Sequence, residues 1–123
     1  MNDMREIARR AEEGDAQAQL AIEMFCYRIE KYIGFYYAVL GRVDAVVFTG
    51  GIGENSVRIR RESCEGLGAL GIALEEQRNE SQLQGVTEIQ SEDSRVKILV
   101  IPTDEELEIA RQTIETIRHA QGL

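Results

Sequence analysis

The stretch from Val43 to Ser56 constrains the fold of this chain more than any other. Its first part, Ala45–Phe48, is an apolar run with two adjacent valines, and its length suits a buried strand. The glycine-rich segment Gly50–Gly53 follows after one residue. Its three glycines permit positive φ angles and leave no Cβ in the path of a close ligand. Asn55 or Ser56 then caps the next helix, whose free N–H groups favour an anion.

An ordinary tight turn between a strand and a helix explains the same pattern, and this reading stays open. Two nucleotide-binding motifs are excluded. The dinucleotide fingerprint requires a glycine three residues after Gly53, where Ser56 stands. The P-loop requires a Gly-Lys-Ser/Thr sequence, and no lysine lies nearby. The segment therefore predicts either a close backbone approach to a ligand of another kind or an ordinary turn that binds no ligand.

Helices and strands alternate along the rest of the chain, which indicates an α/β layered domain formed by residues 1–123. Besides Ala45–Phe48, a strand is expected at Val96–Ile101 and an edge strand at Val86–Ile89. A weakly patterned helix-to-loop segment is expected at Ala73–Gln84. Helices are expected over four ranges: Asp3 to about Glu13, Ala16 to about Leu40, Ser56 to about Leu67, and Asp104 to about Ala120.

The helix expected after Asp15 is long and unusually apolar. One stripe at helical spacing contains Ala18, Ile22, Phe25, Ile29, Ile33, Tyr36 and Leu40. A helix with this much apolar surface is either the spine of the domain or half of a subunit interface. We therefore expect a homodimer in which Phe25 or Tyr36 lies at the contact.

Capping explains several charged residues without any ligand. Asp3 with Glu6, and Thr103 with Glu106, form capping boxes, which leaves Glu105 as the acid without a structural task. Leu107, Ala110, Ile114 and Ile117 form the inner face expected for the last helix. Three further charges, on Arg58, Arg60 and Arg61, fit either a phosphate site or a solvated helix face, and the second is favoured.

Composition narrows the class of protein. The 123 residues suit one domain, and 43% hydrophobic residues are enough for a core. A net charge of -8 argues against a nucleic-acid surface. We expect no signal peptide and no membrane span. Cys26 and Cys64 are too few and too far apart for a disulfide framework or zinc site, so both are expected to be buried, reduced thiols of a cytoplasmic protein.

Three short motifs, in a compatible order and spacing, resemble those of acetate kinases. Phe48–Ser56 resembles the adenosine-binding turn of that family, Asp3–Ile7 resembles a second motif, and Val100–Leu107 a third. The resemblance runs from Asp3 to about Arg111 and covers about the last third of a full-length member. It implies the C-terminal part of an actin-like ATPase domain of the ribonuclease H-like class, helix-rich with a small sheet.

The resemblance also implies roles for individual residues. An adenine nucleotide, ATP or ADP, would contact Asp3, Met4, Arg5, Gly51, Ile52, Gly53, Glu54 and Asn55. Mg²⁺ would be associated with Glu105, although the family usually has asparagine where Asp104 stands. Gly53 is expected to lie against the adenosine, so that a valine there would block the ligand and leave thermal unfolding nearly unchanged.

The implied reaction transfers the γ-phosphoryl group of ATP to acetate or another short carboxylate. The family's phosphate-binding loop, substrate arginine and catalytic aspartate lie earlier in its longer members and have no counterpart here. We therefore expect acetate or acetyl phosphate to bind only to the full-length enzyme, and we assign no catalytic residue. The alternative is an interaction module that dimerises through Ala16–Leu40 and has no activity.

Overall fold

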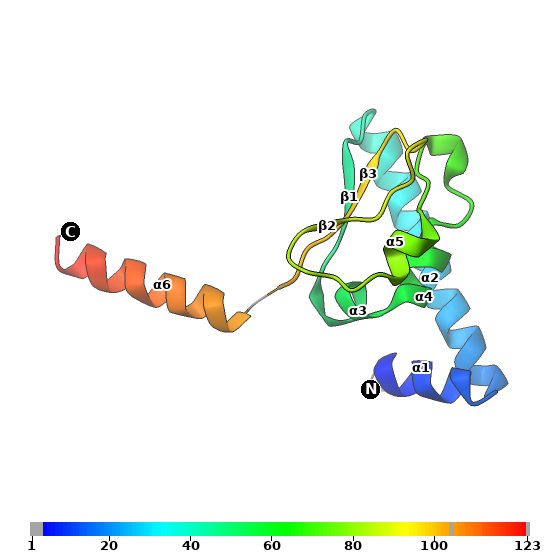
Figure 1. The fold of residues 1–123 in the computed structure, drawn as a ribbon, viewed down its shortest axis with the longest axis horizontal. Coiled ribbons are helices and arrows are strands. Elements are labelled where there is room, and N and C mark those ends of the chain that lie inside the picture. The colour runs from blue at the N-terminus through cyan, green and yellow to red at the C-terminus, as the bar shows by residue number, and fades with distance from the viewer. Residues whose placement is uncertain (1–3, 104, 123) are drawn as a thin grey trace.

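The computed structural model describes residues 4–103 and 105–122, and at 105–109 the backbone only. Figure 1 shows a body of helices around a small sheet, from which the last helix projects as an arm. The elements in chain order are α1 (Met4–Glu12), α2 (Ala16–Leu40), β1 (Ala45–Phe48), α3 (Gly50–Asn55), α4 (Val57–Cys64), the 3₁₀ turn η1 (Gly68–Leu70), α5 (Glu76–Glu80), β2 (Thr87–Glu88), β3 (Lys97–Val100) and α6 (Glu105–Ala120).

Helix α2 has the bounds expected from its sequence signals. The Asp15 carboxylate accepts hydrogen bonds from the N–H groups of Gln17 and Ala18, at 3.0 and 3.2 Å. Those bonds, with the ion pair to Arg10, hold the pKa of Asp15 below its usual value. At the other end, Gly41 adopts a φ of 74° and donates its N–H to the Tyr37 carbonyl. Cap and glycine together confirm the predicted helix.

The sheet has the order β1-β3-β2. Strand β1 runs parallel to β3, with Ala45 opposite Lys97 and Phe48 opposite Val100. Strand β2 pairs antiparallel with β3 at the other edge and is shorter than the predicted Val86–Ile89. Because β1 and β3 are parallel neighbours, their carboxyl ends lie side by side at the same end of the strands. The expected helix-rich α/β arrangement with a small sheet is confirmed.

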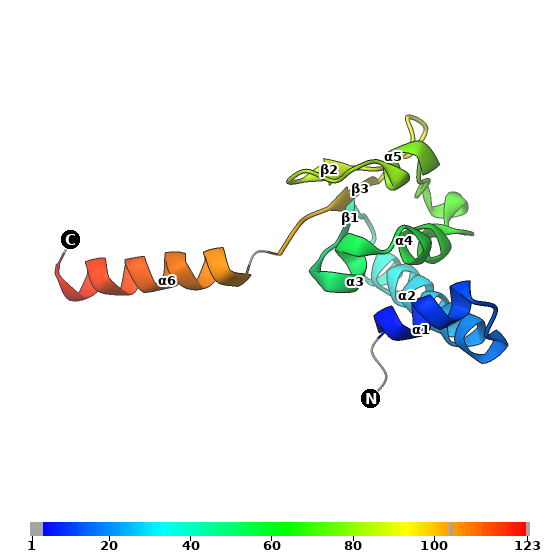
Figure 2. The same ribbon diagram turned by 60° about the horizontal axis from the view of Figure 1, so that its bottom comes forward.

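Two groups of buried side chains form the core. One lies around the sheet and contains Phe48, Cys64, Leu67, Ile72, Ile89, Val96, Ile98 and Val100. The other joins α1, α2 and α4 and contains Ala11, Ala18, Ile22, Cys26 and Ile59. Figure 2 shows α1 and α4 lying against α2. Cys26 and Cys64 are free and buried, as predicted, and burial raises the pKa of Cys64 to about 12.

The glycine-rich segment differs from its prediction. Residues Gly50–Asn55 form the short helix α3 rather than an open turn, and of the three glycines only Gly50 has a positive φ, 76°. Ser56, one of the two expected caps, accepts the Ile59 N–H at 3.1 Å and begins α4. Helix α4 ends at Cys64, three residues before the predicted end at Leu67, because the chain turns at Gly66, with φ 86°.

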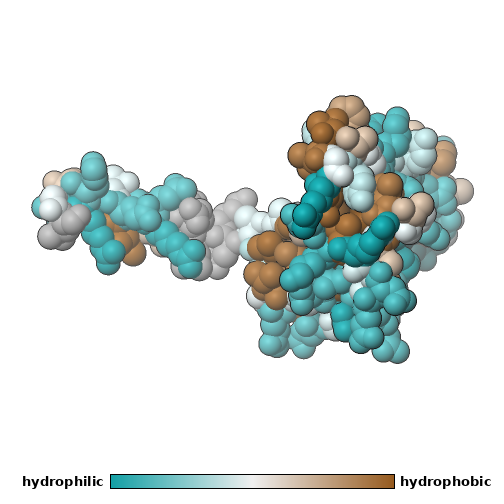
Figure 3. All heavy atoms as spheres, turned by 90° about the horizontal axis from the view of Figure 1, so that it is seen from above, coloured by the Kyte–Doolittle hydropathy of each residue, from teal (hydrophilic) through white to brown (hydrophobic). Residues whose placement is uncertain are grey.

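The prediction of an inner face on the last helix is wrong for Ala110, Ile114 and Ile117. All three are exposed, because no other element of the described chain covers this helix. Most of the arm is hydrophilic in Figure 3. Helix α6 spans Glu105–Ala120, and the predicted first residue lies outside the described part of the chain. Residue 104, and the side chains of Glu106 and Leu107, lie outside the described residues.

Candidate functional site

A cavity of about 480 Å³ opens between α1, α3 and α4. Four residues expected to contact a nucleotide line it: Arg5 from α1, and Gly51, Ile52 and Asn55 from α3. The remaining lining residues are Ala8, Arg9, Glu12, Ile22, Ser56, Val57, Arg58, Ile59 and Arg61. Packing of α1 and α4 on α2 creates this cavity, so segments far apart in the sequence meet at one place.

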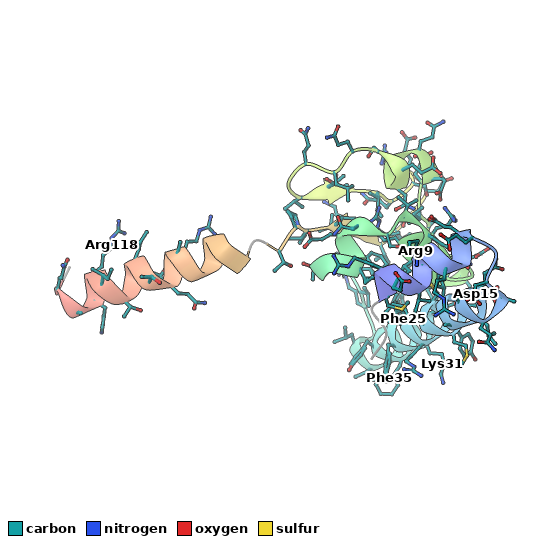
Figure 4. All side chains as sticks on the ribbon, turned by 90° about the horizontal axis from the view of Figure 1, so that it is seen from below. Arg9, Asp15, Phe25, Lys31, Phe35 and Arg118 are labelled. Carbon is teal, nitrogen blue, oxygen red and sulfur yellow. The ribbon has the colours of Figure 1, made fainter. Side chains whose placement is uncertain are left out.

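The cavity wall is rich in arginine. Three of its arginines form ion pairs with carboxylates: Arg9 with Glu6 and Glu13, Arg58 with Glu62, and Arg61 with Glu76. The paired carboxylates raise the pKa of Arg9, so this guanidinium stays charged. Figure 4 shows Arg9 on α1. Arg58 and Arg61 therefore line the cavity while each is paired with a glutamate.

The glycines of α3 face different surroundings. A Cβ on Gly51 would meet no atom within 4 Å, and Gly51 lines the cavity. A Cβ on Gly53 would lie 3.4 Å from the carbonyl carbon of Phe48, toward strand β1. Gly53 therefore packs against the sheet, and we expect a valine there to disturb this packing as well as any ligand. Gly51 is the glycine whose substitution would reach into the cavity.

The start of α3 is tied to the end of β3. The Gly50 N–H lies 3.2 Å from both Glu54 Oε1 and Thr103 Oγ1. Thr49 Oγ1 lies 2.7 Å from Thr103 Oγ1 and donates to the Ile101 carbonyl, also at 2.7 Å. Glu54 Oε1 also accepts the Thr103 N–H. These bonds place the glycine-rich segment beside Thr103, at the carboxyl end of β3.

Other predicted site residues have different positions. Met4 packs with the core group of α1, α2 and α4 and does not line the cavity. Asn55 lines it, but its side-chain amide also donates to the Gly51 carbonyl at 2.7 Å. The remaining two, Asp3 and the side chain of Glu105, lie outside the described residues. Within residues 4–103 and 110–122, no three histidine, cysteine or acidic side chains gather as a metal site.

Arg60 is the residue that sequence reasoning placed wrongly. It is only 1% exposed, rather than part of a solvated face. Its guanidinium donates to the carbonyls of Gly53 and Glu54 and to Asn79. The sequence contained the signal, because Arg60 is three residues after Val57 and four before Cys64, which puts it on the inner face of the same helix.

Comparisons with known proteins agree on one family. The model of the Acetokinase family matches residues 1–111. Acetate kinase of Syntrophobacter fumaroxidans is 71% identical over 119 residues, which cover 97% of this chain and 29% of that protein. Acetate kinase of Nitratidesulfovibrio vulgaris is 56% identical, with 96% and 29% covered. The chain thus spans less than a third of the length of these relatives. No helix in the described part of the chain could cross a membrane.

Solved structures of the family have the same fold over this part. Porphyromonas gingivalis acetate kinase superposes with a TM-score of 0.82 at 40% identity, covering 94% of this chain and 29% of that chain. A propionate kinase from Francisella tularensis gives a TM-score of 0.75 at 44% identity, covering 88% and 27%. The small mixed sheet and its helices therefore match part of acetate kinase structures, and this chain belongs to the acetokinase family.

Proposed function

We propose that this chain supplies the nucleotide-binding part of a longer enzyme that transfers the γ-phosphoryl group of ATP to acetate or another short carboxylate. The observation that carries the proposal is the cavity in which Arg5 of α1 meets Gly51, Ile52 and Asn55 of α3. Two motifs that resemble the family's nucleotide-binding motifs lie apart in the sequence and line the same cavity.

The cavity has properties that a nucleotide site requires. Its volume of about 480 Å³ falls in the range of small-molecule pockets. Ile52 offers an apolar surface to a base, and Gly51 presents backbone without a side chain. Arg5 suits stacking on a base or pairing with a phosphate. The other arginines of the wall are each paired with a glutamate. ATP or ADP is the ligand we assign to it.

Mg²⁺ is the metal ion that the proposal includes, with the carboxylate of Glu105 as its protein donor. Mg²⁺ keeps several waters and binds through one or two carboxylates together with substrate phosphates, so a full protein cage is not required. Glu105 follows Thr103 by two residues in the sequence, and the Thr103 hydroxyl accepts the Gly50 N–H of the glycine-rich segment. We assign Glu105 to this ion, which would neutralise phosphate charge during transfer.

Titration of the 123-residue chain with ATP tests the proposal. We expect amide NMR shifts at residues 5, 51, 52 and 55, which line the cavity. Glu105→Gln should weaken the enhancement of binding by Mg²⁺ more than the matched Glu106→Gln. Absence of shifts at these residues with millimolar ATP and Mg²⁺ would contradict nucleotide binding by this chain, and equal effects of the two variants would contradict the metal assignment.

A second candidate role, subunit assembly through α2, rests on a different observation. Large apolar side chains are exposed along this helix: Leu20, Met24, Tyr27, Tyr32, Phe35, Tyr36, Val39 and Leu40. Its second half also borders an apolar groove of about 300 Å³ beside β1. Figure 4 shows Phe35 and Lys31 on the outer side of α2. Exposed apolar surface of this extent is typical of an interface, and we propose a homodimer.

We predict that light scattering reports a dimer of the chain at micromolar concentration. Phe35→Glu or Tyr36→Glu should weaken it at least about tenfold, because a carboxylate would be buried without a partner. Phe35 and Tyr36 are 61% and 56% exposed, whereas Phe25 is partly buried against the core and is a poor test. Ile114→Glu is the matched control, since Ile114 on α6 is 49% exposed. A monomeric wild-type chain would refute the dimer.

We propose the cytoplasm as the compartment. The buried thiols of Cys26 and Cys64 are unpaired and suit a reducing environment. The net charge of -8 supports the absence of nucleic acid among the partners.

A further inference from the structure

Arg60 holds its charge inside the protein among neutral acceptors. Its Nη1 donates to the Gly53 carbonyl at 2.9 Å and the Glu54 carbonyl at 2.8 Å. Its Nε donates to Asn79 Oδ1 at 2.7 Å, and its Nη2 to the Asn79 carbonyl at 3.0 Å. Burial lowers the pKa of Arg60, and the nearby charge of Glu76 opposes that shift.

A buried guanidinium is costly, and packing alone does not require one. An apolar side chain of similar volume would fill the same space without the loss of hydration. Arg60 instead satisfies carbonyl groups at the end of α3, which have no partner within so short a helix. The planar fork of donors allows one side chain to reach two segments in fixed geometry, which a lysine ammonium does not reproduce.

Asn79 completes the arrangement from α5. It is 0% exposed, and its Nδ2 donates to the Val57 carbonyl at 3.0 Å, at the start of α4. Helix α5 is itself anchored to the sheet region, because the Glu75 N–H donates to the Ile89 carbonyl at 2.9 Å. A continuous set of hydrogen bonds therefore runs from the segment after β2, through α5 and Arg60, to the carbonyl end of α3.

We propose that Arg60 and Asn79 form a buried clamp that positions α3 for the nucleotide without touching it. The clamp holds Gly53 and Glu54, whereas Gly51, Ile52 and Asn55 of the same short helix face the cavity. Loosening one side of a six-residue helix displaces the other. Arg60 and Asn79 are thus positioning residues for the proposed nucleotide site, and this part of the inference rests on the proposed function.

Hydrogen exchange on the ligand-free chain tests the clamp independently of any nucleotide. Arg60→Lys keeps the charge but loses the fork, and Asn79→Ala removes one acceptor and the donor to Val57. We expect amides 54–56 to exchange at least about tenfold faster in Arg60→Lys, and to a smaller extent in Asn79→Ala. Amides of β3 should exchange as in wild type. Arg78→Met is the matched control, because the exposed Arg78 also donates to a carbonyl, that of Gln90 at 2.8 Å.

The clamp proposal would be contradicted if amide exchange accelerated equally in β3 and in residues 54–56, or if it accelerated in neither. If Arg60→Lys does not fold, Asn79→Ala decides by the same comparison. ATP titration then connects the clamp to function: affinity should fall at least about tenfold in Arg60→Lys and stay unchanged in Arg78→Met. Loosened α3 with unchanged ATP affinity would overturn the positioning role. A wild-type chain that binds no ATP would instead refute the proposed function, while the exchange result still judges the clamp.

Discussion

Gly51→Val is expected to weaken ATP binding by roughly 5- to 150-fold, which corresponds to an overpacking cost of about 1–3 kcal/mol. The added side chain would project from α3 into space that the proposed ligand occupies, since Gly51 lines the cavity and a Cβ there meets no protein atom within 4 Å. The free energy of unfolding should stay within about 0.5 kcal/mol of wild type, because valine is no worse than glycine within a helix. Urea unfolding and ATP titration of the same samples provide the two measurements.

Gly53→Val is the matched variant, two residues away in the same helix. A Cβ at Gly53 already lies 3.4 Å from Phe48, so the two methyl groups of valine would press against β1. We expect unfolding to become easier by about 1–3 kcal/mol. If Gly51→Val destabilised the chain while leaving ATP binding intact, α3 would be a structural turn and the cavity would not hold the nucleotide.

Local signals were enough to predict α2 and both longer strands. The carboxylate of Asp15 and the positive φ of Gly41 fix the ends of α2 through interactions with neighbouring residues only. The apolar run Ala45–Phe48 likewise forms the predicted strand, but the prediction that this strand is buried is wrong for Val47, which is 47% exposed, and only Phe48 is fully buried. Whether β1 and β3 pair in parallel depends on the connection between them, which local sequence signals do not determine.

The candidate site was only partly predictable, because its geometry depends on contacts between distant segments. Arg5 and Gly51 meet only after α1 and α4 have packed on α2. Gly51 and Gly53 face different surroundings because the glycine-rich segment forms the helix α3, whereas the sequence predicted a turn. Arg60 was assigned to a solvated face because runs of charge on helices usually face water. Its buried partner Asn79 comes from a segment with weak periodicity.

The apolar faces show a similar limit. Periodicity predicted an apolar face on α2 and on α6, but it does not identify the surface against which each face packs. In this chain, Phe35 of α2 and Ile117 of α6 are both exposed. For α2 we assign a second subunit, and the light-scattering experiment with Phe35→Glu decides that assignment. The relatives are more than three times longer than this chain, so further covering surfaces are available in them.

The largest expected effect is the absence of acyl phosphate synthesis by these 123 residues alone. Phosphoryl transfer requires the carboxylate, the γ-phosphate and Mg²⁺ to be held in line within one site. In the proposed function, the chain would supply one wall of such a site, consisting of the glycine-rich segment, Arg5 and Glu105. The substrate arginine and catalytic aspartate that the family resemblance implies have no counterpart in it, and His119, at the end of the exposed helix α6, is no substitute.

A hydroxamate assay with ATP, Mg²⁺ and acetate measures acyl phosphate formation directly, and the isolated chain should give the background rate. Without the rest of the site, the phosphates of a bound nucleotide stay in contact with water, and the electrostatic stabilisation of a closed site is lost. ATP binding should survive, because its expected contacts lie in the cavity between α1, α3 and α4. Addition of the matching N-terminal part of the enzyme should restore activity if the two parts reassemble. Turnover by the purified chain alone would show that a catalytic group lies within it. That result would contradict the proposal that this chain supplies only the nucleotide-binding part.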